Sequence, residues 1–62
     1  MTPKPRHAMR ARIATHSRLQ LEHRLVALRR ACARSGAPRM LEWELYEVEW
    51  RLREMARDEA RV

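Results

Sequence analysis

Glycine, cysteine and aromatic residues are scarce in this sequence of 62 residues. It has one Gly, one Cys, no Phe, two Trp and one Tyr. A single cysteine, Cys32, cannot form an internal disulfide, and no second thiol or nearby pair of histidines gives it the spacing of a zinc site. One Gly and three Pro leave most of the chain free of residues that interrupt helices. The composition excludes a disulfide framework and favours long helices.

Long apolar runs are also missing. No stretch of about 18 apolar residues is present, and the first fifteen residues lack the apolar segment of a signal peptide. A chain this short buries too little surface to form a deep cleft. No Ser/His/Asp set, paired carboxylates or Gly-rich phosphate loop can be assembled from it. We therefore expect a cytoplasmic protein that is not an enzyme, has no cofactor or metal, and has no membrane partner.

Acidic residues are rare in the first part of the chain. The formal net charge is +6, yet residues 1–36 contain a single acid, Glu22, whereas residues 37–62 contain seven. The two parts are electrically complementary. Folding one against the other would neutralise part of the basic surplus.

Apolar residues recur at helical spacing in two segments separated by one strong turn signal. The turn is Ser35-Gly36-Ala37-Pro38, where Gly suits the left-handed position after a helix and Pro suits the first turn of the next. Alternating steps of three and four predict an apolar seam on each side of it. We predict an all-α fold, a two-helix antiparallel hairpin forming one domain over residues 1–62, with helix 1 about 6–34, turn 35–37 and helix 2 about 38–60. The predicted hairpin core consists of Leu21, Leu25, Leu28, Cys32, Leu41, Leu45, Val48, Leu52 and Met55.

Two patterns compete for the start of the first helix. Pro3 and Pro5 favour a start near residue 5, and the Ala, Met and Arg residues that follow are good helix formers. Ser17 and Gln20 instead form a capping box, which would start the helix at residue 18 and leave a basic arm before it. We favour the early start.

A single hairpin of this size has a thin core. Two-helix chains of about this length usually need a staple or an oligomer to be stable. We therefore predict a homodimer in which two hairpins close into a four-helix bundle.

A second stripe lies on the side of each helix opposite the seam. Trp43 and Trp50 are one heptad apart and about 150° from Leu45, and Leu19 and Val26 have the same spacing on the first helix. The stripe could pack along the outside of the hairpin, form the dimer contact, or bind a partner, because Trp, Tyr and Arg are enriched at binding hot spots. The candidate partner-binding residues are Trp43, Tyr46, Trp50, Arg57, Leu19 and Val26.

Basic residues gather at the start of the chain. In a simple hairpin this end would face the mixed charges of residues 51–61 and would be neutralised less than the arginines near the turn. Contact with phosphate or with an acidic protein surface is one interpretation, and a solvated surface is the other. The candidate polyanion-binding residues are Lys4, Arg6, Arg10, Arg12 and Arg18.

Two functional hypotheses follow. The first is a small regulatory or inhibitory protein that binds another protein through the hairpin surface. The alternative is a dimer that binds RNA or DNA through the basic first helix. A recognition helix of the helix-turn-helix kind is disfavoured, because the start of the second helix carries Glu42, Glu44, Glu47 and Glu49 and a major groove would repel it.

Overall fold

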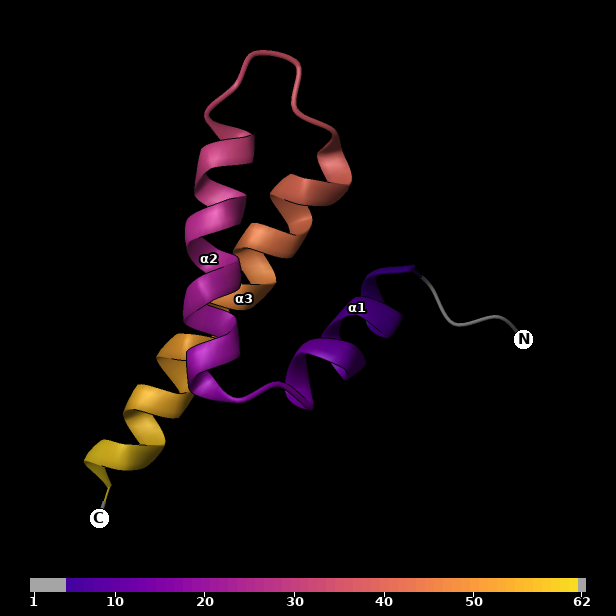
Figure 1. Ribbon diagram of the computed structural model, residues 1–62. Coiled ribbons are helices and arrows are strands. Elements are labelled where there is room, and N and C mark those ends of the chain that lie inside the picture. The colour runs from indigo at the N-terminus through magenta and orange to yellow at the C-terminus, as the bar shows by residue number, and fades with distance from the viewer. Residues whose placement is uncertain (1–4, 62) are drawn as a thin grey trace.

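A computed structural model describes residues 5–61, with side chains from Arg6 onward, and these residues form three helices (Figure 1). The helices are α1 (Pro5–Ala14), α2 (Arg18–Cys32) and α3 (Arg39–Ala60). No strand occurs in the described part of the chain. The predicted all-α class is confirmed for it.

The predicted continuous first helix is wrong, because the chain leaves the helical path at residues 15–17. Thr15 Oγ1 donates a hydrogen bond to the carbonyl oxygen of Arg12 at 2.7 Å, and His16 Nδ1 lies 2.8 Å from the same oxygen. These local bonds compete with continuation of the helix. Ser17 is extended, with φ −72° and ψ 163°. The early start and the capping box are therefore both correct, each for its own helix.

The capping box starts α2. Ser17 Oγ accepts a hydrogen bond from the backbone N–H of Gln20 at 3.2 Å, and the backbone N–H of Ser17 donates to Gln20 Oε1 at 2.8 Å. Two N–H groups that a helix start leaves free are thereby satisfied.

The turn is slightly longer than predicted. Gly36 has φ of +80°, the left-handed conformation that glycine adopts without strain. The helix before it ends at Cys32 rather than near Arg34, and Pro38 is the N-cap of α3 rather than a residue of its first turn. The connection therefore spans residues 33–38.

The long helix α3 is the centre of the structure. α2 and α3 form the antiparallel hairpin, and α1 folds back beside α3, while its contacts with α2 are few (Figure 1). The overall dimensions are 42 × 34 × 14 Å, and the radius of gyration is 12.7 Å, whereas a compact chain of this length has about 10.6 Å. The three helices thus make a thin layer.

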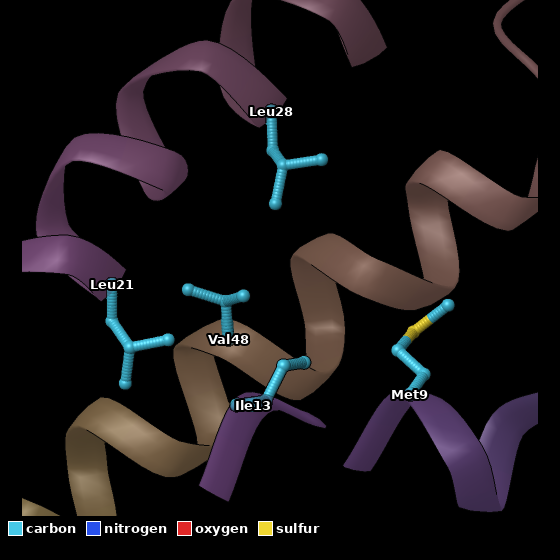
Figure 2. Packing of buried hydrophobic residues seen from close by; sticks show 5 residues of the cluster. All are labelled: Met9, Ile13, Leu21, Leu28 and Val48. Atoms are coloured by element: carbon cyan, nitrogen blue, oxygen red, sulfur yellow. The ribbon is translucent and has the colours of Figure 1, made fainter. Parts of the chain in front are cut away.

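The core lies where all three helices meet. Met9 and Ile13 of α1, Leu21 and Leu28 of α2, and Val48 of α3 are the buried hydrophobic residues (Figure 2). Partly buried side chains pack around them, namely Leu25, Leu41, Trp43, Leu45, Leu52 and Met55. Cys32 is partly exposed at the end of α2.

None of the three helices is both long and apolar enough to cross a bilayer.

Candidate functional site

Glu47 joins α1 to α3. Its side chain is only 4% exposed, and it accepts hydrogen bonds from Arg6 Nε at 3.0 Å and from Arg10 Nε at 2.8 Å. Arg6 and Arg10 are one helical turn apart, so both reach the same carboxylate. A buried carboxylate needs such partners. Glu47 therefore fixes the position of α1 along α3.

Glu44 makes the corresponding link to α2. It accepts two hydrogen bonds from Arg24, the Nη2 bond being 3.1 Å long, and Arg12 Nη2 lies 3.8 Å from it. The hydrogen bond from Arg24 is the main reason why the pKa of Glu44 is lowered, although burial opposes it. For Glu47, burial is the largest influence and would raise the pKa, but hydrogen bonds and charge from Arg10 and Arg6 together lower it. Both acids stay ionised at neutral pH.

These acids neutralise part of the basic start of the chain, because Arg6 and Arg10 share Glu47 and Arg12 and Arg24 share Glu44. Arg6, Arg10 and Arg12 are engaged as described above, and Arg18 Nη1 donates to Glu59 at 2.6 Å. The expectation that this end faces residues 51–61 fails for α1, because the break at residues 15–17 turns α1 back along the middle of α3. Lys4 lies outside the described residues.

The aromatic stripe of α3 is divided by α1. Trp43 is partly buried and packs against the core, because α1 covers that side of α3. The guanidinium carbon of Arg6 lies 5.8 Å from the centre of the Trp43 ring and 5.4 Å from that of Tyr46, within the range of a cation–π contact. Tyr46 and Trp50 remain 53% and 45% exposed. Arg57 lies over the ring of Trp50 at 5.9 Å.

These exposed residues border a groove between α1 and α3. Its volume is about 470 Å³, and Ile13 of α1 and Tyr46, Trp50 and Arg51 of α3 contribute to its walls. Arg51 Nε is buried there and has no hydrogen-bond partner among residues 5–61. A buried N–H group without an acceptor is rare in folded proteins.

Trp50 also borders a shallow depression on its other side. Arg53, Ala56, Arg57 and Ala60 of α3 form this depression, which has a volume of about 480 Å³. We call Tyr46, Trp50 and Arg57, together with the groove and the depression, the α3 face.

Leu19 and Val26 are not part of the α3 face. They are 62% and 53% exposed on α2. At 100° per residue they lie roughly 160° from the buried Leu21 and Leu28, which contact α3. The six residues of the predicted stripe thus occupy three places: a half-buried Trp43, the α3 face, and the outer side of α2.

Metal ligands do not gather in residues 5–61, where no three His, Cys, Asp or Glu side chains come together. His16 and His23 border a second groove, of about 530 Å³, which Arg12, Arg24 and Glu44 also line. Glu44 is already bonded to Arg24, and the two guanidinium groups disfavour a cation there.

Sequence reasoning missed three residues that organise the structure. Met9 and Ile13 are four positions apart and make one apolar stripe on α1, which a search for a separate short helix would have found. Glu47 lies among several acids of α3, and its neighbours in sequence do not distinguish it from Glu49. Only the path of α1 determines which acid is buried.

No protein-family model matches the chain, and no curated protein or solved structure matches it either. The class of protein that the fold defines is a small, arginine-rich bundle of three helices.

Proposed function

We propose that this chain is a non-enzymatic protein-binding module whose α3 face docks on another polypeptide. The observation that carries the proposal is the trio of Tyr46, Trp50 and Arg57, whose two aromatic rings are about half exposed beside a groove between α1 and α3. Trp, Tyr and Arg are the residues that dominate binding hot spots.

The chain would regulate or inhibit its partner by occupying part of the partner's surface. A module that covers part of another protein's surface changes that protein's activity without chemistry of its own. The structure offers an extended surface suited to this, since its helices form a layer 14 Å thick.

Self-association belongs to the same proposal. A thin layer with few buried residues gains stability when a second copy covers one of its faces. The proposed homodimer uses one end of the α3 face and leaves aromatic surface for the partner. A four-helix bundle made only from α2 and α3 would have to accommodate α1, which occupies one side of α3.

The alternative, nucleic-acid binding by the basic first helix, has less support. Arg6 and Arg10 share the single negative charge of Glu47, and Arg12 and Arg18 also lie close to acids, so this helix offers a phosphate less free charge than its composition indicates.

Immobilised full-length chain, incubated with nuclease-treated host lysate, tests the proposal. The Tyr46→Ala/Trp50→Ala variant should lose a protein that the parent chain retains. The matched control, Leu19→Ala/Val26→Ala, removes two equally exposed apolar side chains from α2 and should retain that protein. If Leu19→Ala/Val26→Ala loses the protein while Tyr46→Ala/Trp50→Ala retains it, the assignment to the α3 face is refuted.

A further inference from the structure

The hairpin tip holds four of the six arginines that form no ion pair with an acid among residues 5–61; the other two are Arg57 and Arg61. We define the tip by Arg29 and Arg30 in the last turn of α2, Arg34 in the turn, and Arg39 at the start of α3. All four are exposed, and none forms an ion pair with an acid among residues 5–61.

The tip dominates the charge of the molecule. Residues 29–41 contain no acid, so the four arginines carry +4 of the formal +6. The sequence pattern had indicated the reverse, a neutralised turn and a positive start of the chain. Glu47 is bonded to Arg10 of α1 and Glu44 is bonded to Arg24, so neither of these acids pairs with an arginine of the tip.

Helix electrostatics explains only half of the cluster. Arg29 and Arg30 lie at the negative end of the α2 dipole, where cations are favoured. Arg39 is the first residue of α3, where a cation is disfavoured. The same first turn carries Glu42, whose negative charge does suit that end of the helix.

We propose that the tip binds the phosphodiester backbone of a double-stranded nucleic acid. Arginine forks match phosphate oxygens, and a duplex presents one charge per about 1.7 Å of its axis. Aromatic side chains, on which unpaired bases would stack, occur only at positions 43, 46 and 50, outside the tip. Specific binding to an acidic protein surface would need a large aromatic side chain beside the arginines, and the exposed aromatic side chains lie on the α3 face instead. The inference does not depend on the proposed protein partner.

Binding of the full-length chain to three fluorescent probes tests the inference: a 20-base-pair DNA duplex, an RNA duplex of the same sequence, and polyglutamate. With about four phosphate contacts, affinity for a duplex should fall about 150-fold between 50 and 200 mM salt. Arg29→Gln/Arg30→Gln should reduce this to about 12-fold and weaken binding at 50 mM salt. Preference for one duplex over the other would identify which nucleic acid is the ligand.

The matched control is Arg53→Gln/Arg61→Gln, which removes the same charge from exposed positions on and after α3. It should retain the steep salt dependence of the parent chain. The inference is overturned if polyglutamate binds as tightly as the duplexes, if no duplex binds at 50 mM salt, or if the control weakens binding as much as the tip variant. Circular dichroism of both variants shows whether they are folded.

Discussion

Arg10 donates a hydrogen bond from Nε to Glu47 Oε2 at 2.8 Å, across 37 positions of the sequence. Arg6 donates to the other carboxylate oxygen. Glu47 is the one buried charged residue among those that the structure describes, and these two bonds satisfy its carboxylate. The contact determines where α1 lies, and with it which aromatic and basic residues remain free.

Glu47→Gln should destabilise the chain less than the double change Arg6→Gln/Arg10→Gln. The single variant removes the buried charge and leaves two exposed guanidinium groups, at a cost of about 1–2 kcal/mol. The double variant leaves a buried carboxylate without partners, which costs more than the loss of the charge itself. Chemical denaturation measures both. Glu54→Gln, which breaks only an exposed pair with Arg51, is the control and should cost less than about 0.5 kcal/mol.

Acid should weaken the links that Glu47 makes to α1 and Glu44 makes to α2. Because the folded-state pKa values of Glu44 and Glu47 are lowered, their contribution is complete above the ordinary value of about 4.3 and is lost as the pH falls below it through the folded-state values. Hydrogen exchange of the α1 amides, measured from pH 7 to pH 3, should show protection that is constant down to about pH 4.5 and then falls. Protection that decreased steadily from pH 7 would contradict the assignment.

Ser17→Ala should weaken the start of α2. The capping hydrogen bond from the Gln20 amide is lost, which typically costs about 1 kcal/mol. Faster hydrogen exchange at Gln20 would report the effect locally. Ser35→Ala in the turn, where no capping bond exists, should change stability by less than about 0.5 kcal/mol. Equal effects of the two changes would argue against the capping box.

Replacing each tryptophan in turn should separate effects on folding stability from effects on association. Trp43→Ala removes a ring that packs on the core and should cost about 2 kcal/mol of the free energy of unfolding. Trp50→Ala, on the exposed side, should cost under about 1 kcal/mol in the monomer. Sedimentation of Trp50→Ala then tests the dimer: a shift towards monomer is expected if a second copy covers the α3 face. Unchanged association would place the dimer contact elsewhere.

Local signals predicted most of the secondary structure. Ser17 with Gln20, and Gly36 with Pro38, mark positions where the backbone itself requires a particular residue, so they could be read without the fold. The error was to join residues 6–34 into one helix, although Thr15, His16 and Ser17 all compete for backbone hydrogen bonds.

The candidate sites were harder to predict because they depend on α1. Once α1 turns back, Trp43 becomes part of the packing, Glu47 becomes buried, and the start of the chain loses part of its free positive charge. A pattern of spacing along α3 assigns the same character to Trp43 and Trp50. Their difference comes from a contact between segments more than thirty positions apart.

The central claim is that the α3 face is where another polypeptide docks. Its most direct test places a photoreactive phenylalanine derivative at position 50 of the full-length chain, and at position 19 in a parallel variant, followed by irradiation in host cells and mass spectrometry. Position 50 should give a crosslink to a polypeptide, and a second copy of the 7.5 kDa chain would be recognised by its mass. Position 19 should not give the same adduct. The absence of any adduct from position 50, or identical adducts from both positions, would contradict the claim.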